Sequence, residues 1–355
     1  MGSVEEKPET KRWKTEAQSK QKKKKKKCKL LRYEELPEYM KENQFIRNYY
    51  RAEWPIKNAL LSLFSWHNET LNIWTHLLGF IVFLGLSSMH LSYHVPQVAE
   101  FLGHLTWPIS TSAVENVSCS LGNFFGEAAA FIKLAASSET TAAVSSSVEA
   151  AARWPFFVFL GGSMFCLLSS STCHLLCCHS HRLNIFLLRM DYVGIAVMIV
   201  TSFFPPIYYI FQCDPHWQLT YLVAISAMGF VTVFTLLAPH LSTGEFRTYR
   251  ALLFVGMGCF GVVPALHAAV VNWDDPRRNA TLAYEAAMAV SYLTGTLFYV
   301  TRVPERWKPG WFDLAGHSHQ IFHVFVLAGA MAHYGAALIF LRRRDELGCG
   351  GAGLQ

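Results

Sequence analysis

Charged residues are scarce in this chain, and its positive excess is local. Only 16% of the 355 residues are charged, whereas 52% are hydrophobic. Eight of the 31 basic residues lie between Lys20 and Lys29, and the remaining 23 face 25 acidic residues. This composition is typical of a membrane protein. It excludes a basic surface spread over the folded part, so we expect no nucleic acid partner.

Paired cysteines and an N-terminal apolar stretch are also missing. Nine cysteines are scattered along the chain without repeated CxxC pairs, so their spacing indicates no disulfide framework. Cys166, Cys173 and Cys259 lie in apolar segments, where we expect them to pack as small hydrophobic residues. Residues 1–30 contain no apolar run like that of a signal peptide, so we expect insertion to depend on the first membrane helix.

The N-terminal 70 residues divide into two polar parts. Residues 1–30 are lysine-rich, which predicts a disordered cytoplasmic tail attracted to anionic lipid. Residues 31–70 are interpreted as a cytoplasmic or interfacial amphipathic segment. Within it, Pro55 precedes apolar residues at helical spacing, which favours a helix lying on the membrane surface. These residues are Ile56, Leu60, Leu61, Leu63 and Phe64.

Seven apolar runs predict an all-α membrane protein with a seven-transmembrane-helix bundle in residues 71–341. Each run is close to the roughly 20 residues that cross the hydrocarbon core of a bilayer. We place them near residues 72–93, 154–177, 191–211, 218–238, 249–271, 283–301 and 317–341. Pro205 and Pro206 are expected to bend or end the third helix. Residues 95–153 are interpreted as a long outer loop with an interfacial helix, and residues 342–355 as a short outer tail.

The distribution of basic residues predicts a cytoplasmic N-terminus and an outside C-terminus. The lysine-rich tail and most loop arginines lie on one side of the seven-helix arrangement, which we assign as cytoplasmic. Arg342, Arg343 and Arg344 lie on the other side and oppose this assignment. We expect a multi-pass protein of the plasma membrane, with internal membranes as the alternative.

Ionisable residues gather at one end of the predicted bundle. His319 and His323 stand four residues apart at the start of the last segment, so they share one helix face. His174 lies near the end of the second segment, with Ser170 one turn before it, and Asp191 begins the third segment. The number of membrane crossings between these positions places all five side chains at the same membrane face.

Three histidines with an open fourth position are the ligand set of catalytic zinc sites. We therefore predict Zn²⁺ bound by His174, His319 and His323, with Asp191 as a ligand or as the group that holds a water molecule. Iron, nickel or copper would also suit these ligands. A cysteine-containing site is the alternative, but Cys173 points about 100° away from His174 on a helix.

A second polar group lies at the same end of the first segment. Glu69, Asn72 and His76 line one helical face there. They could be extra ligands or proton carriers, but we favour a polar network that ties the first helix to its neighbours.

Short motifs follow one another in a fixed order over most of the chain, from about Glu35 to Tyr334. They are Glu35-Leu36-Pro37, Tyr50-Arg51, His67-Asn68-Glu69-Thr70, Asn72-Ile73-Trp74-Thr75-His76, Ser170 with His174, Asp191-Tyr192, Gly194-Ile195-Ala196, Pro304-Glu305-Arg306, Pro309-Gly310 and Ser318 to His323. A chain with these motifs resembles the progestin and adipoQ receptor family, which includes the adiponectin receptors. The lysine-rich tail and the Ala/Ser-rich loop are similar to the plant heptahelical branch of that family.

The resemblance implies that His174, His319 and His323 are zinc ligands, that Asp191 holds the zinc-bound water, and that Ser170 lies beside it. It also implies a cytoplasmic N-terminus and an outside C-terminus. The long segment 95–153 departs from the adiponectin receptors on the face where a protein ligand would dock. We therefore do not expect an adiponectin-like ligand.

The first functional expectation is an adiponectin-receptor-like protein in hormone, stress or lipid signalling. Its expected partners are membrane lipid, an unknown extracellular or lipid ligand, and a cytoplasmic signalling partner that binds the N-terminal region. The alternative is a ceramidase-like, zinc-dependent lipid amide hydrolase that releases fatty acid and sphingoid base, with Asp191 and Ser170 as catalytic residues. A channel ranks last, because its polar residues should continue through the bilayer, whereas here they crowd one end.

Overall fold

The computed structural model describes residues 28–94, 151–238, 241 and 244–347. The chain divides into two units, one of residues 1–83 with 152–344 and one of residues 84–151 with 345–355. All predicted site residues belong to the first unit. The expected lysine-rich tail up to residue 27, the expected outer loop from 95 to 150, and the residues after 347 lie outside the described residues.

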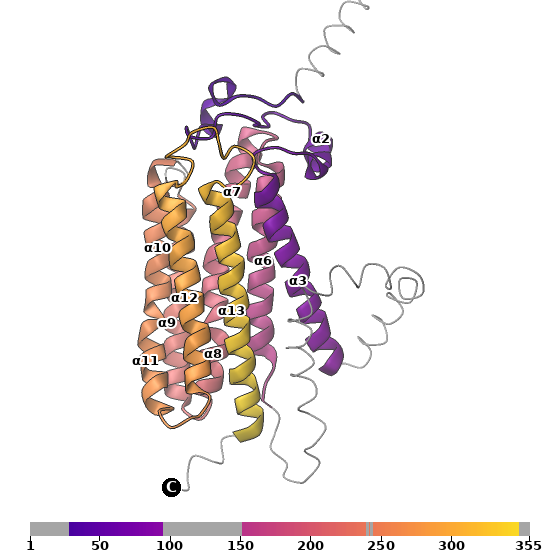
Figure 1. Cartoon of the computed structure of the whole chain (residues 1–355). Coiled ribbons are helices and arrows are strands. Elements are labelled where there is room, and N and C mark those ends of the chain that lie inside the picture. The colour runs from indigo at the N-terminus through magenta and orange to yellow at the C-terminus, as the bar shows by residue number, and fades with distance from the viewer. Residues whose placement is uncertain (1–27, 95–150, 239–240, 242–243, 348–355) are drawn as a thin grey trace, which may run out of the picture. The chain divides into compact units, whose positions relative to one another are not determined.

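Long helices account for the apolar runs, and the described residues contain no β-strand apart from an isolated bridge between Leu31 and Tyr50. In the first unit, which includes α3 up to residue 83 and α13 up to residue 344, the helices lie side by side (Figure 1). They are α3 (Thr70–His94), α6 (Trp154–Leu176), α7 (His181–Ser202), α8 (Phe204–Ile210), α9 (Pro215–Leu236), α10 (Arg247–Phe260), α11 (Val262–Val271), α12 (Arg278–Thr301) and α13 (Ser318–Leu347).

Six stretches of the described residues are long and apolar enough to cross a membrane. They are Thr70–Ser92, Trp154–Leu176, His181–Ile210, Pro215–Leu236, Arg247–Val271 and Ser318–Leu347. The remaining long helix, α12, has 24 residues but carries Arg278 and Glu285 and does not belong to these six. The all-helical membrane class is therefore confirmed, whereas seven crossings and the orientation of the termini stay predictions.

The predicted start of the third segment is wrong. Asp191 lies in the middle of α7, because that helix begins at His181, ten residues earlier than predicted. Apolar residues at helical spacing (Leu183, Phe186 and Leu187) already begin there, although Arg182 and Arg189 interrupt them. The predicted effect of the two prolines is confirmed, since α7 ends at Ser202 and Pro205 lies in the first turn of α8.

Close contact between α6 and α7 depends on small residues. A Cβ atom added at Gly162 would overlap the side chain of Thr201 on the facing helix. The same atom added at Gly194 would lie 3.1 Å from the Cα of Cys166. These glycines let the backbones of α6 and α7 approach, and α6 and α7 carry His174 and Asp191 respectively.

Residues 28–69 form an irregular segment at the end of the bundle where α6 ends and α13 begins (purple in Figure 1). It contains short 3₁₀ turns, Tyr33–Glu35 and Glu38–Met40, followed by α2 (Ile56–Leu61) and a further turn, Ser62–Phe64. A helix after Pro55 is thus confirmed, although it has only six residues. Leu61 and Phe64 are exposed, which suits the predicted contact with a membrane surface.

The described cysteines follow the expectation in part. Cys166, Cys173 and Cys259 are free, and the first two are buried, as expected of small hydrophobic residues. Cys213 takes part in a disulfide, which the scattered cysteine pattern did not indicate.

Candidate metal centre

Three histidines from two helices converge at one end of the bundle. His174 lies in the last turn of α6, and His319 and His323 lie in the first two turns of α13. One ring nitrogen from each lies within 4.8 Å of the other two, and the Nε2 atoms of His174 and His319 are 3.2 Å apart. Imidazole nitrogens at these separations could bind one metal ion.

The N-terminal segment fixes the end of α6 on which His174 lies. The Arg51 guanidinium donates a hydrogen bond of 2.7 Å to the carbonyl of His174 and one of 3.0 Å to the carbonyl of Leu175. The last carbonyls of a helix have no partner within the helix, so a cation there satisfies them and also suits the helix dipole. Arg51 is almost completely buried, and Ser62 accepts a third bond from it.

A buried carboxylate fixes the start of α13. Glu305 accepts hydrogen bonds from the backbone N–H and the hydroxyl of Ser318, the first residue of that helix. Gly316 just before it has a φ angle of +84°, a left-handed conformation that side chains disfavour, and its N–H donates to Gln320. Asn43 of the N-terminal segment also donates to Glu305. These contacts set the rotation of α13 and hence the direction of His319 and His323.

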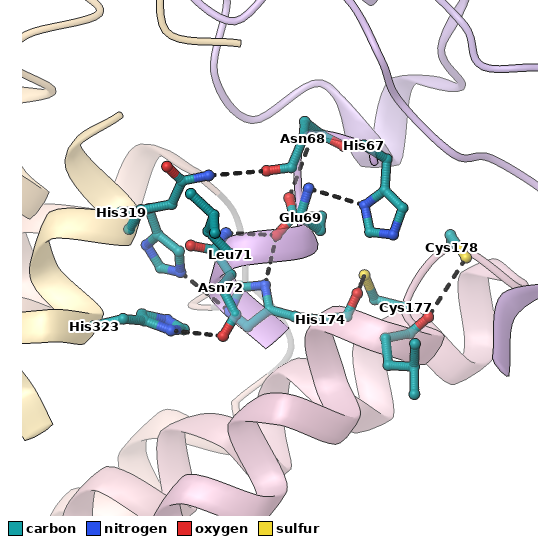
Figure 2. Close-up of polar contacts among 12 residues, drawn as sticks. His67, Asn68, Glu69, Leu71, Asn72, His174, Cys177, Cys178, His319 and His323 are labelled. Carbon is teal, nitrogen blue, oxygen red and sulfur yellow. Dashed lines mark hydrogen bonds and ion pairs between the residues drawn. The ribbon is translucent and has the colours of Figure 1, made fainter. Parts of the chain in front are cut away.

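Hydrogen bonds on the far side of two rings determine which nitrogen faces the cluster. His174 donates from Nδ1 to a Glu69 oxygen at 2.7 Å, and His323 donates from Nδ1 to the carbonyl of Asn72 at 3.1 Å. Figure 2 shows both contacts, with the two rings directed toward each other from α6 and α13. Their Nε2 atoms therefore carry lone pairs toward the cluster. Such partners behind histidine ligands are the usual arrangement in metal sites.

Glu69 is the carboxylate behind His174, and it lies in the turn just before α3. It also accepts a hydrogen bond of 2.6 Å from the side chain of Asn72. Burial raises the pKa of Glu69, but the hydrogen bonds from His174 and Asn72 and the neighbouring charges of His174 and His317 together outweigh this effect and hold the pKa below its usual range. Glu69 is therefore an anion next to the cluster, and an anion there favours a cation at the histidines.

The polar network predicted around Glu69, Asn72 and His76 is present, but it ends on the candidate ligands. The ring of His76 stacks on that of His323, with centroids 3.7 Å apart and planes 6° from parallel. His76 is buried, and neither of its ring nitrogens has a hydrogen-bond partner among the described residues. Sequence reasoning placed these residues at the correct end but missed that they orient His174 and His323.

Asp191 and Ser170 line a cavity beside the cluster rather than joining the three histidines. Both side chains are buried, and the Ser170 hydroxyl lies close enough to interact with the Asp191 carboxylate. Among the described residues, the group that could hold a metal consists of the three histidines without a carboxylate or a thiol. The alternative of Cys173 as a ligand therefore finds no support.

The cavity has a volume of about 270 Å³ and is mostly apolar. Its wall contains His319, His323, Asp191 and Ser170 together with apolar residues such as Phe254. Arg250 and Tyr299 also reach it. A ligand with an apolar chain could therefore lie in the bundle with a polar group against the histidines.

The fold and the cluster define a class, that of multi-pass helical membrane proteins with a buried histidine centre. The chain belongs to the Haemolysin-III related family, whose model matches residues 64–122 and 123–334. It is 63% identical to the heptahelical transmembrane protein ADIPOR1 of Oryza sativa subsp. japonica over 91% of this chain and 87% of that protein. It is 54% identical to heptahelical transmembrane protein 1 of Arabidopsis thaliana over 90% of this chain and 83% of that protein.

A more distant relative comes from an animal. The adiponectin receptor protein of Drosophila melanogaster is 32% identical over 86% of this chain and 58% of its own length. These relatives confirm the expected resemblance to adiponectin receptors and to their plant heptahelical branch.

Proposed function

We propose that this chain is a receptor-like membrane protein that binds one zinc ion through His174, His319 and His323. The observation that carries the proposal is the convergence of three ring nitrogens within 4.8 Å, two of them oriented by hydrogen bonds from behind. The donor set fits zinc, because neutral imidazoles with a neighbouring carboxylate are common at such sites. The metal analysis described below distinguishes zinc from iron, nickel and copper.

The bound ion would join α6 to α13, because its ligands come from both helices. A ligand in the adjoining cavity would then act on helices that are held together at one end only. The names of the relatives support a receptor role, and the proposed setting is hormone, stress or lipid signalling at the plasma membrane. In the proposed orientation the N-terminal segment faces the cytoplasm, where a signalling partner would bind it.

A zinc-dependent lipid amide hydrolase is the second candidate, favoured by the cavity that places apolar walls next to the cluster. A zinc ion with three histidine ligands supplies a Lewis acid and lowers the pKa of a bound water to about 7. In this reading Asp191 accepts a proton from water in the cavity, and Ser170 holds the Asp191 carboxylate. The apolar cavity would hold the acyl chain of the amide.

Metal analysis of the purified protein tests the site itself. The unaltered protein should contain about one zinc per chain, and His319→Ala/His323→Ala should contain almost none. His181→Ala is the matched control, because it removes an exposed histidine at the same end of the bundle. Stoichiometric zinc in the double variant would refute the ligand assignment, and stoichiometric iron, nickel or copper in the unaltered protein would refute zinc.

Fatty-acid release from ceramide distinguishes the two functions. Release by the unaltered protein that the double variant lacks would establish the hydrolase. Equal, negligible release by both proteins, with zinc bound only to the unaltered one, would favour the receptor.

A further inference from the structure

A second cavity lies toward the opposite end of the bundle, and the proposed function does not use it. Its volume is about 290 Å³, and α7, α8, α10, α11, α12 and α13 contribute to its walls. Most of the wall is apolar, with residues such as Phe203, Ile207, Ala268 and Phe340. Ligand pockets usually have volumes of roughly 300–1,000 Å³, so this cavity suits one slender molecule rather than a two-chain lipid.

Three arginines and one aspartate lie at the polar rim of this cavity. Asp275 accepts hydrogen bonds from the Arg343 guanidinium and from the backbone N–H of Arg277. Arg343 also donates to the side chain of Asn272 at 2.6 Å, and Arg278 lines the same rim. Asp275 thus faces the guanidinium groups of Arg277 and Arg343, whereas Arg278 donates to the carbonyl of Trp273 and stacks on its ring. Each guanidinium has five N–H donors, more than these contacts use, so three cations at the rim share one carboxylate. The rim keeps a positive excess and suits an anionic group such as a carboxylate.

A buried histidine and a glutamate line the inner wall of the same cavity. Glu285 Oε1 lies 3.1 Å from Nδ1 of His333, which is only 2% exposed. Their geometry is nevertheless poor, since this oxygen and both ring nitrogens lack an acceptable hydrogen bond to any described residue. Buried polar atoms are normally hydrogen-bonded. A polar group of a ligand at this depth would complete them.

The spacing along two helices gives the depth of this polar pair. Glu285 follows Arg278 by seven residues on α12, and His333 precedes Arg343 by ten residues on α13. At about 1.5 Å of rise per residue, the pair lies roughly 10–15 Å inward from the rim.

From this arrangement we infer that the second cavity binds a single-chain lipid with an anionic head group at Arg277, Arg278 and Arg343. The chain enters the apolar interior, and a hydroxyl group roughly 10–15 Å along it hydrogen-bonds with His333 and Glu285. A long-chain fatty acid hydroxylated near the middle of its chain has this chemistry. This cavity shares wall residues such as Met288 and Tyr292 with the cavity beside the metal centre, but none of the proposed polar contacts lines that other cavity. Its occupation does not require zinc.

Binding of 12-hydroxystearate to the full chain in nanodiscs tests this inference, with stearate and the uncharged diol of the same length as comparison ligands. The unaltered protein should bind 12-hydroxystearate saturably and roughly tenfold more tightly than stearate, the difference expected of one hydrogen bond. It should bind the diol much more weakly than 12-hydroxystearate, because the diol lacks the anion.

Variants then assign the two ends of the ligand. Arg278→Ala/Arg343→Ala should weaken binding of both fatty acids at least tenfold, whereas Arg306→Ala, an exposed arginine at the other end of the bundle, should not. His333→Phe should bind the two fatty acids equally. Ala268→Phe should weaken both by filling the cavity while leaving the rim intact.

The metal centre provides the remaining control. His319→Ala/His323→Ala should bind 12-hydroxystearate as the unaltered protein does, whatever its zinc content. Three results would each overturn the assignment. The arginine variant could bind 12-hydroxystearate as tightly as the unaltered protein does, His333→Phe could still prefer 12-hydroxystearate to stearate, or the metal-site variant could lose binding. Thermal unfolding of every variant identifies any that fails to fold. If the arginine variant does not fold, Ala268→Phe still tests whether the ligand lies in this cavity.

Discussion

Among the residues that the structure describes, two histidine–glutamate pairs join helices or helix ends, one at the candidate metal centre and one in the middle of α13. In the first pair His174 Nδ1 lies 2.7 Å from Glu69, and in the second His333 Nδ1 lies 3.1 Å from Glu285. The first pair is part of a network, because Asn72 also holds Glu69 and the opposite nitrogen of His174 faces two more histidines. The second pair faces an apolar cavity. The same two residue types thus orient a candidate metal ligand in one place and leave polar atoms for a different ligand in the other.

The two pairs should differ most in zinc content when the histidine of each is replaced. We expect His174→Ala to lose stoichiometric zinc, because two histidines from α13 alone leave the set of three ligands incomplete. His333→Ala should retain about one zinc per chain, since it lies outside the histidine cluster. Metal analysis after gel filtration measures both. Retention of zinc by His174→Ala, or its loss from a folded His333→Ala, would show that the two pairs do not differ in their role in metal binding.

Lowering the pH should protonate His67, a histidine near the candidate metal centre that belongs to neither pair. His67 accepts a hydrogen bond at Nδ1 from the N–H of Glu69, and its Nε2 donates to the carbonyl of Ser62, so the neutral ring is the form that fits. Burial lowers the pKa of His67 to about 4. The unfolded chain takes up this proton near pH 6.5, and the folded chain does so only near pH 4. The stability contributed by the neutral ring is therefore complete above about pH 6.5 and is lost as the pH falls toward 4.

The loss should reach at most about 3.5 kcal/mol, at about 1.4 kcal/mol for each of the 2.5 pH units between 6.5 and 4. We would measure apparent unfolding temperatures of the metal-free protein from pH 7 to pH 4. His67→Gln is the matched variant, because an amide keeps one donor and one acceptor but does not titrate. It should show a flatter pH dependence, and identical curves for the two proteins would contradict the assignment.

The two glutamates should differ in their effect on metal affinity. We expect Glu69→Gln to weaken zinc binding roughly 10- to 100-fold, because a neutral amide holds His174 less strongly and removes the anion next to the cluster. Glu285→Gln should leave the affinity unchanged. Competition with a chelator of known affinity measures both values. Equal affinities for the two variants would show that Glu69 does not orient a ligand.

The sequence predicted the first pair's surroundings better than the second's. Helical spacing and the count of membrane crossings placed His174, His319 and His323 at one end, and these arguments depend only on periodicity. They could not reveal Arg51 and Glu305, which hold the ends of α6 and α13 through irregular segments that have no period. The recurrent motifs did contain both residues, but a motif does not state what a side chain contacts.

The errors have physical causes as well. The sequence predicts a helix start at Asp191 because charged residues interrupt the preceding turn, although the apolar residues of that turn keep helical spacing. Glu285 is a charged residue in the mostly apolar helix α12. Nothing in the spacing of α12 and α13 indicates that this residue faces His333, because the pairing depends on the rotation of two helices about their own axes.

Packing between α6 and α7 provides the finest test of whether the two ends act independently. Gly162→Ala should destabilise the protein by about 1–3 kcal/mol, because the new methyl group overlaps Thr201, whose branched side chain has little room to move. Gly161→Ala is the matched control, since nothing lies within 4 Å of the added atom, and it should stabilise the helix by up to about 1 kcal/mol. Gly162 is twelve residues from His174 along α6, roughly 18 Å. Zinc affinity should therefore stay constant in both variants while unfolding temperatures move in opposite directions. A fall in zinc affinity in Gly162→Ala would mean that strain near the middle of α6 reaches the candidate ligand in its last turn.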